Sequence, residues 1–90
     1  MESKIDANDL FSLRQENNER LEDYVQRFRE KTLESRDTIL ENNMIRACMN
    51  GMMDEYHIYI ENHDIQDFVE LIYKAQNTRA LVSRLRRIYE

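Results

Sequence analysis

The sequence predicts an all-α fold, a compact bundle of about five helices. The chain has no proline and a single glycine, Gly51, so it contains few of the residues that end helices and form turns. Strong helix formers such as Glu, Arg, Leu, Met and Gln are abundant, and apolar residues recur at helical spacing. With 41% apolar residues in a chain of 90, residues 1–90 are predicted to form one small domain.

A polar turn separates the first two predicted helices. Asp6 is a suitable N-cap for a short helix over residues 7–13, because its carboxylate can accept hydrogen bonds from the first turn. Residues 15–18 are polar and predict a turn. Residues 21–33 predict the clearest amphipathic helix, with Glu and Arg opposite its apolar face. The apolar residues of these two helices are Leu10, Phe11 and Leu13, and then Leu21, Tyr24, Val25 and Phe28.

Three further helices are predicted along the rest of the chain. The third covers residues 38–50, and Gly51 is the expected first residue beyond its end. A short fourth helix covers residues 54–61. Asp64 is the expected N-cap of a long fifth helix over residues 65–88, whose first half is expected in the core. The apolar residues of this helix are Phe68, Val69, Ile72, Ala75, Leu81, Val82, Leu85 and Ile88.

The charge distribution limits the kinds of partner. A formal net charge of -5 argues against nucleic-acid binding by the whole domain, because phosphates attract a positive surface. Basic residues gather near the C-terminal end, where Arg84, Arg86 and Arg87 are candidates for a weak contact with RNA. Cations near the end of a helix also stabilise its dipole, so these arginines have a structural explanation as well.

The single cysteine and the hydropathy pattern predict a cytoplasmic protein without membrane contact. Cys48 cannot form a disulfide within the chain, which fits a reducing compartment. No apolar run approaches the roughly 20 residues of a membrane span. No leader with a charged and then an apolar region is expected at the start of the sequence.

No set of residues indicates an enzyme, a metal site or a cofactor. His57, His63 and Cys48 are the only soft ligands, and their spacing fits no zinc pattern. Cys48 lies on an apolar stripe without an adjacent base, so a buried, inert thiol is expected. Neighbouring acidic residues such as Glu22 and Asp23 diverge on a helix and are expected to be solvated.

One segment carries a recognisable motif. Residues 13–28 read LRQENNERLEDYVQRF, in which a Gln, a turn and a Glu precede an apolar residue and then Tyr-Val-x-Arg-Phe. The positions that fill this pattern are Gln15, Glu19, Leu21, Tyr24, Val25, Arg27 and Phe28. The pattern resembles the major homology region of capsid proteins from retroviruses and gypsy-type LTR retrotransposons. We call residues 13–33 the homology-region-like segment; residues 44–52 resemble, more loosely, the small-apolar-Gly-apolar signature that follows it.

The resemblance implies a fold and a set of roles. The implied fold is that of a retroviral capsid C-terminal domain, covering residues 1–90. Gln15, Glu19 and Arg27 are expected to satisfy one another in a polar network, with Arg27 donating to Glu19 or to carbonyls of the turn. Glu16 stands where many family members have glycine, so the turn must have backbone angles that a side chain tolerates. The expected core beneath the network consists of Leu21, Tyr24, Val25 and Phe28.

The third predicted helix is apolar around most of its circumference. One stripe contains Leu40, Met44, Ala47 and Cys48, and a second contains Ile45, Met49 and Met52. One stripe suffices for a core, so the second is either a contact with another copy or additional core filled by flexible methionines. In the capsid family this helix commonly forms the two-fold dimer contact. The candidate dimer interface is therefore Ile45, Met49 and Met52.

The resemblance implies a structural function. The expected protein is a capsid domain of a retrotransposon gag, which dimerises and assembles into virus-like particles in the cytoplasm. The implied partners are copies of the same chain and the N-terminal capsid domain of the same polyprotein. One alternative is a host-domesticated gag remnant that acts as an adaptor for a protein or peptide. Another is an RNA-binding module that uses the basic C-terminal residues.

Overall fold

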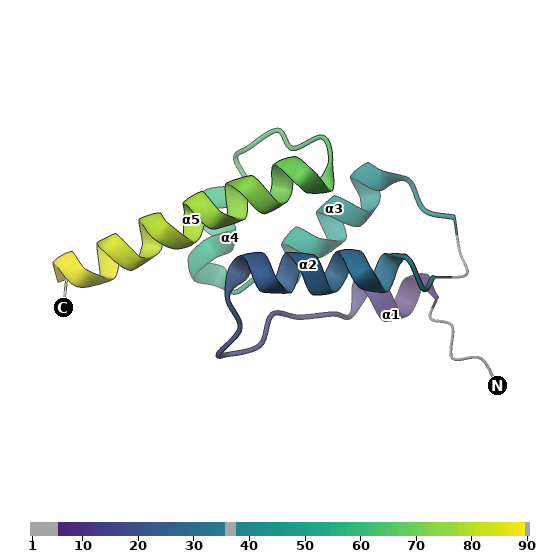
Figure 1. Cartoon of the computed structure of the whole chain (residues 1–90), viewed down its shortest axis with the longest axis horizontal. Helices are drawn as coiled ribbons and strands as arrows, with labels where there is room; N and C mark the ends of the chain where they lie inside the picture. The colour runs from purple at the N-terminus through teal and green to yellow at the C-terminus, as the bar shows by residue number, and fades with distance from the viewer. Residues whose placement is uncertain (1–5, 36–37, 90) are drawn as a thin grey trace.

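The computed structural model describes residues 6–35 and 38–89, and the prediction of an all-α fold is confirmed over these ranges. The regular elements there are five α-helices (Figure 1). These helices are α1 (Ala7–Phe11), α2 (Leu21–Thr32), α3 (Glu41–Asn50), α4 (Asp54–Ile60) and α5 (Phe68–Tyr89).

Helix α1 begins at the predicted cap but is shorter than predicted. Asp6 Oδ1 accepts a hydrogen bond from the Asp9 amide at 3.1 Å, and Asp9 Oδ2 accepts one from the Asp6 amide at 3.0 Å. The helix ends at Phe11 because the hydroxyl of Ser12 donates back to the Asp9 carbonyl and the chain then turns away. Leu10 is fully buried, whereas Phe11 is largely exposed.

Helix α2 supplies the centre of the core, and its bounds differ from the predicted helix by one residue at the C-terminal end. Its four predicted apolar residues are all fully buried: Leu21, Tyr24, Val25 and Phe28. The ring of Phe28 lies 6.2 Å from that of Tyr24 in an edge-on arrangement and 6.2 Å from that of Phe68 on α5. Helix α2 packs along α5, so the two longest helices form the main interface of the bundle.

Helix α3 starts at Glu41, three residues later than predicted. Leu40 is the N-cap and is 68% exposed, so its placement on the buried stripe was wrong. Gly51 is the C-cap with φ of −91°, a conformation open to any residue, and it is not a left-handed residue beyond the helix. Glycine is needed here because a side chain would have no room.

Helix α5 also starts three residues later than predicted, because Asp67 caps it and Asp64 does not. Asp67 Oδ1 accepts a hydrogen bond from the Glu70 amide at 2.8 Å. The Phe68 amide donates to Glu41 Oε2 at 3.2 Å, so a carboxylate on α3 holds a second free amide of this helix start. Asp64 instead accepts a bond from the Gln66 side chain at 2.9 Å. The fourth predicted helix ends one residue early, at Ile60.

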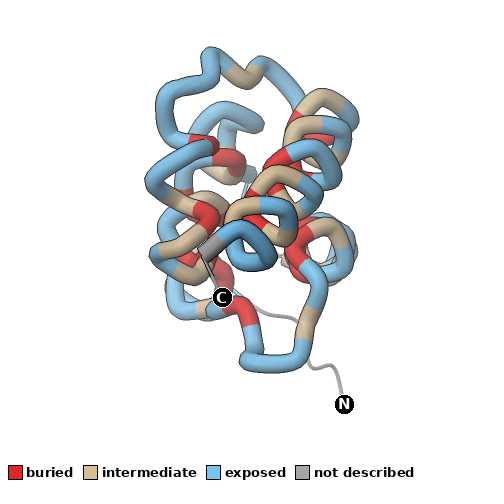
Figure 2. Tube along the Cα trace, turned by 90° about the vertical axis from the view of Figure 1, so that its left-hand side faces the viewer, coloured by how far each residue is buried: buried red, intermediate tan, exposed pale blue. Residues whose placement is uncertain are grey.

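The first two thirds of α5 face the core and its last turns do not. The buried residues are Phe68, Leu71, Ala75, Thr78 and Val82. Val69 is 70% exposed, so its predicted place in the core was wrong, and the buried Leu71 was missed. Beyond Val82 the helix projects from the bundle, as Figure 1 shows, and Figure 2 shows this end exposed while buried positions line the inside. The Cα trace measures 50 × 26 × 16 Å.

Within the described part of the chain, none of the helices has both the length and the apolar character that a membrane crossing requires.

Candidate functional site

The homology-region-like segment is organised by the side chain of Arg27. Its Nε donates to Glu19 Oε2 at 2.8 Å and its Nη2 donates to Glu19 Oε1 at 2.9 Å, which is the paired geometry of a guanidinium with a carboxylate. Nη2 also donates to the Arg14 carbonyl at 2.8 Å. The guanidinium lies 5.6 Å from the centre of the Tyr24 ring. One arginine on α2 therefore holds both ends of the loop before it.

Gln15 ties the same loop to the junction between α3 and α4. Its amide N–H donates to the Gly51 carbonyl at 2.8 Å, and its side-chain Oε1 accepts from the Met53 amide at 2.9 Å. Its Nε2 donates to the Glu19 carbonyl at 2.9 Å. The residue is 8% exposed, so water does not compete strongly for these bonds. The structure thus brings Gln15, Glu19 and Arg27 into one connected network.

Glu19 closes the turn of this loop. The Glu19 amide donates to the Glu16 carbonyl at 3.0 Å, and the Glu16 amide donates to Glu19 Oε1 at 3.0 Å. No described residue has a positive φ, so Glu16 occupies its position without backbone strain. The hydrogen bond from Arg27 lowers the pKa of Glu19 most strongly; burial opposes the shift, and the Glu16 amide adds to it.

Beneath the network, Tyr24 connects α2 to the end of α3. Its hydroxyl donates to the Cys48 carbonyl at 2.7 Å, and burial raises the pKa of this phenol far above its usual value. A Cβ atom placed on Gly51 would lie well inside 3.0 Å of both the Tyr24 hydroxyl and the Leu13 carbonyl oxygen. Glycine at position 51 is therefore what allows α2, the end of α3 and the loop after α1 to meet at this point.

A second ion pair, not predicted from the sequence, joins α2 to α5. Arg79 Nε donates to both carboxylate oxygens of Glu22, at 2.8 and 3.0 Å. Burial is the largest single influence on the pKa of the Glu22 carboxyl and raises it. The hydrogen bond and charge of Arg79, with a backbone hydrogen bond and the charge of Arg20, together outweigh burial, so the pKa is lowered. The prediction that Glu22 is simply solvated was therefore wrong. The two residues are 57 positions apart, and no local pattern in the sequence connects them.

We expect the Glu22–Arg79 pair to contribute modestly to stability. Arg79 is about one-third exposed at its side chain and Glu22 much less, so a double-mutant cycle with Glu22→Gln and Arg79→Ala should give a coupling of about 1 kcal/mol or less. Urea denaturation of the four proteins measures it. The exposed Lys31–Glu34 pair, at 4.0 Å, is the matched control and should give no coupling. Equal coupling in both cycles would contradict this ranking.

Two of the three candidate dimer residues lie in the core. Ile45 is 3% and Met52 is 5% exposed, and Met49 is half-buried against the same cluster. The interpretation of Ile45 and Met52 as an exposed interface was therefore wrong; α3 is surrounded by α1, α2 and α4 and needs both stripes for packing. The exposed side of α3 is polar instead. It consists of Asn42, Asn43, Arg46 and Asn50.

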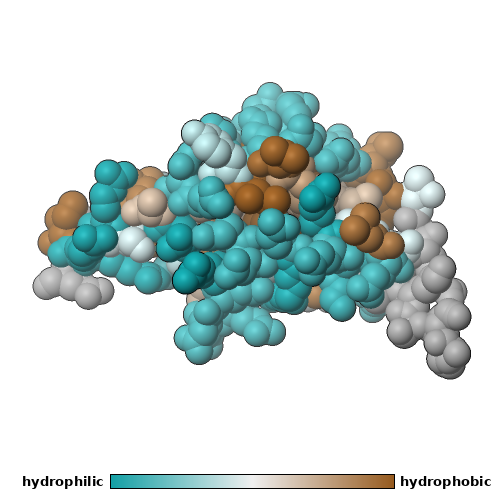
Figure 3. Space-filling model, viewed as in Figure 1, coloured by the Kyte–Doolittle hydropathy of each residue, from teal (hydrophilic) through white to brown (hydrophobic). Residues whose placement is uncertain are grey.

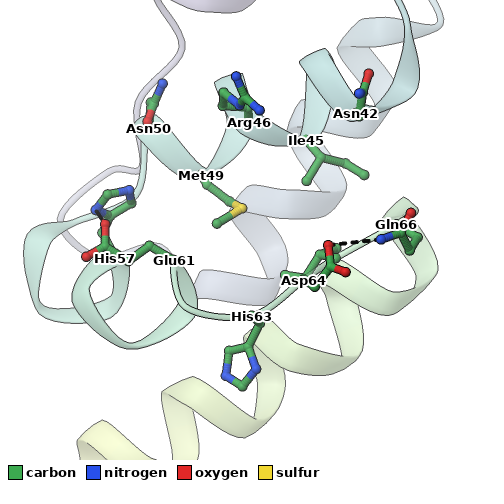
Figure 4. Close-up of a pocket in the computed structure, with 11 residues that line it drawn as sticks. Asn42, Ile45, Arg46, Met49, Asn50, His57, Glu61, His63, Asp64 and Gln66 are labelled. Atoms are coloured by element: carbon green, nitrogen blue, oxygen red, sulfur yellow. Dashed lines mark hydrogen bonds and ion pairs between the residues drawn. The ribbon is translucent and has the colours of Figure 1, made fainter.

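A hollow of about 460 Å³ lies beside α3, between that helix, α4 and the loop that precedes α5. Figure 4 shows Met49 pointing into it from α3, with His57 and Glu61 at one end and Asp64 and Gln66 at the other. Its walls are mostly polar. Imidazoles, carboxylates and Arg46 share its lining with three apolar side chains, so it offers no uniform charge to a ligand.

The candidate ligand and nucleophile residues are dispersed. Cys48 is buried, and burial raises the pKa of its thiol, which makes it a poor nucleophile. His57 lies 3.5 Å from Glu61 through its Nδ1, and the exposed His63 follows α4. Among the residues that the structure describes, no three His, Cys, Asp or Glu side chains gather as a metal site would require.

The basic end of α5 is exposed, and one of its three arginines forms an ion pair within the chain. Arg86 forms an ion pair with Glu55 on α4. Arg84 and Arg87 are exposed, and no ion pair links either to the described residues. The three arginines therefore do not form one patch, since Arg86 is directed towards α4.

No protein family, curated protein or solved structure matches this chain.

Proposed function

We propose that this chain is a capsid-type assembly domain, the C-terminal capsid domain of a retrotransposon gag polyprotein. The observation that carries the proposal is the closed hydrogen-bond network of the homology-region-like segment, in which Arg27 binds Glu19 and Gln15 binds backbone of the α3–α4 junction. An ordinary amphipathic helix with surface Glu and Arg needs none of these bonds. Their presence at the motif positions supports a role for the motif in fixing one rigid domain shape.

The work of such a domain is self-association. The partners would be copies of the same chain and the N-terminal capsid domain of its polyprotein, in cytoplasmic particles. Weak two-fold contacts that act together give lattices that can assemble and dissociate. Contact through α3 would use its exposed side, around Arg46 and Asn50, because Ile45 and Met52 are buried. A contact of Arg84 and Arg87 with RNA would be subsidiary, since the net charge is -5.

The test is sedimentation equilibrium of the 90-residue chain over a wide concentration range. We expect a weak, reversible dimer that Arg46→Glu weakens without changing helicity, because a contact through the exposed side of α3 would lose the hydrogen-bond donors of this guanidinium in both copies. Arg29→Glu, an exposed arginine on α2, is the matched control and should leave the association unchanged. A chain that stays strictly monomeric at about 1 mM would contradict a dimer contact of even −4 kcal/mol.

A second candidate function is that of a gag-derived adaptor, and the hollow beside α3 supports it. Ile45, Met49 and Ile65 give this hollow an apolar floor within a polar rim, so an apolar side chain of a bound peptide would fit there. A monomeric chain that nevertheless keeps its helicity would favour the adaptor over the assembly domain.

A further inference from the structure

Apolar side chains remain uncovered where α4 lies against the C-terminal half of α5. Ile58 is 54% and Tyr59 is 36% exposed on α4, and Ile88 is 70% exposed on α5. Leu81 and Leu85 are half-buried and precede Ile88 at intervals of four and three residues, which places the three on one side of α5. We call Ile58, Tyr59, Leu81, Leu85 and Ile88 the α4–α5 face. Figure 3 shows apolar surface at the projecting end of α5.

The α4–α5 face is hollowed on both sides of Tyr59. One hollow of about 280 Å³ is lined by Glu55, Ile58, Tyr59, Val82, Leu85 and Arg86. A second of about 250 Å³ lies between Tyr59 and Leu81, with Lys74 and Asn77 at its edge. The surface that lines the first hollow is more apolar than polar. Such a face can receive the ridge of apolar side chains that another helix presents.

Charge is segregated along the part of the chain that forms this face, with α4, the following loop and the start of α5 acidic and the end of α5 basic. Between positions 54 and 73 the chain has acidic residues but neither Lys nor Arg: Asp54, Glu55, Glu61, Asp64, Asp67 and Glu70. Between positions 79 and 89 it has arginines and no acidic residue: Arg79, Arg84, Arg86 and Arg87. Two of these arginines are engaged within the chain, Arg79 with Glu22 and Arg86 with Glu55. Arg84 and Arg87 therefore carry charge outward beside the apolar ridge.

These features make the face complementary to itself. The end of α5 offers an apolar ridge flanked by cations, and α4 with the segment that follows it offers apolar residues flanked by anions. A two-fold axis would place the α5 end of each copy over α4 of the other, so that Arg84 approaches the acidic residues of its mate. RNA fits less well, because the carboxylates of α4 would repel its phosphates beside the same arginines.

We propose that the α4–α5 face is a contact between two copies of this chain, formed by reciprocal docking of the α5 ends. This contact deepens the proposed function. Its role in building an assembly rests on that function, whereas the contact itself does not. A domain with one two-fold contact forms closed dimers, whereas a second contact on another face links those dimers into an open array. The exposed side of α3 and the α4–α5 face lie on different helices and would supply the two contacts.

Sedimentation equilibrium of the 90-residue chain tests this contact with Ile58→Asp and Ile88→Asp. Either change should raise the dissociation constant at least tenfold, since a carboxylate would replace an apolar anchor on each side of the symmetric contact. Val69→Asp is the matched control, because Val69 is 70% exposed like Ile88 but lies about 120° around α5 from Leu81. Circular dichroism checks that helicity is kept; if Ile88→Asp frays α5, Ile58→Asp on α4 decides.

The outcomes separate this inference from the proposed function. Weakened association in Ile58→Asp, with Val69→Asp unchanged, supports the α4–α5 contact whatever Arg46→Glu does. Association that both α4–α5 variants leave intact and Arg46→Glu weakens overturns this contact but leaves the assembly function standing. A chain that is monomeric at about 1 mM overturns both. Arg84→Glu should also weaken the dimer, and tighter association in that variant would contradict the proposed match of charges.

Discussion

Replacing Gly51 by alanine is expected to destabilise the domain by about 3 kcal/mol or more. This is at or above the usual cost of overpacking, because neither the buried Tyr24 side chain nor the Leu13 backbone can move freely. The new methyl group would overlap the Tyr24 hydroxyl and the Leu13 carbonyl oxygen. Moving the hydroxyl would break its bond to the Cys48 carbonyl, and moving position 51 would disturb the bond from the Gln15 amide. Thermal unfolding should show a decrease in Tm of about 12 °C or more.

The matched control for this change is Asn50→Ala. Asn50 is exposed at the last position of α3, so its truncation should alter the Tm by no more than a few degrees. The double variant Gly51→Ala, Tyr24→Phe removes the hydroxyl but leaves the Leu13 carbonyl, and it should recover only part of the loss. A Tm of Gly51→Ala equal to that of Asn50→Ala would contradict the steric explanation.

Replacing Arg27 by alanine is expected to cost about 2–3 kcal/mol in the free energy of unfolding. The change removes both bonds to the Glu19 carboxylate and the bond to the Arg14 carbonyl. Glu19 is only 14% exposed at its side chain, so water would replace the lost donors incompletely. Arg27→Lys should recover only part of the loss, because an ammonium group cannot bind both carboxylate oxygens in the paired geometry. Urea denaturation measures the three proteins.

The dependence of this loss on pH follows from the lowered pKa of Glu19. A carboxyl whose pKa is lower in the folded than in the unfolded state stabilises the fold above its ordinary value of 4.5, and this contribution is lost as the pH falls through the lowered pKa. The difference between wild type and Arg27→Ala should therefore shrink well below pH 4.5. Arg29→Ala, at an exposed position of the same helix, should show neither the loss nor its pH dependence. A difference that stays constant to low pH would exclude the Glu19 contact as its source.

The buried face of helix α2 was predicted accurately because its hydrophobic pattern fits only one helical face. Its apolar residues recur on a single face and polar residues fill the rest, so its buried side chains follow from spacing alone. The start of α5 was predicted less well because several residues before it can cap a helix. A tertiary contact favours the helix start at Asp67 over one at Asp64. In this contact the Phe68 amide donates to Glu41, a residue 27 positions earlier in the sequence. No local rule contains that information.

The sequence motif predicted which residues form the polar network. It did not predict which residues outside the motif they bind. Arg27 and Glu19 lie 8 positions apart on a turn and the helix after it, so their meeting follows from local geometry. The bonds of Gln15 to Gly51 and Met53 join segments that lie more than 30 positions apart in the sequence. The burial of Ile45 and Met52 was missed for the same reason, because spacing shows that a helix has two apolar stripes but not which neighbours cover them.

The bond between Gln15 and Met53 also determines how the domain would bear mechanical load. It joins positions 38 residues apart and encloses α2 and α3 in one hydrogen-bonded loop, outside which α4 and α5 lie. Tension applied through the C-terminal end would act first on side-chain contacts of the last turns of α5, such as the Arg86–Glu55 pair, and then on the Glu22–Arg79 pair, so these contacts can break one turn at a time. The enclosed loop would remain intact until that helix had been pulled off.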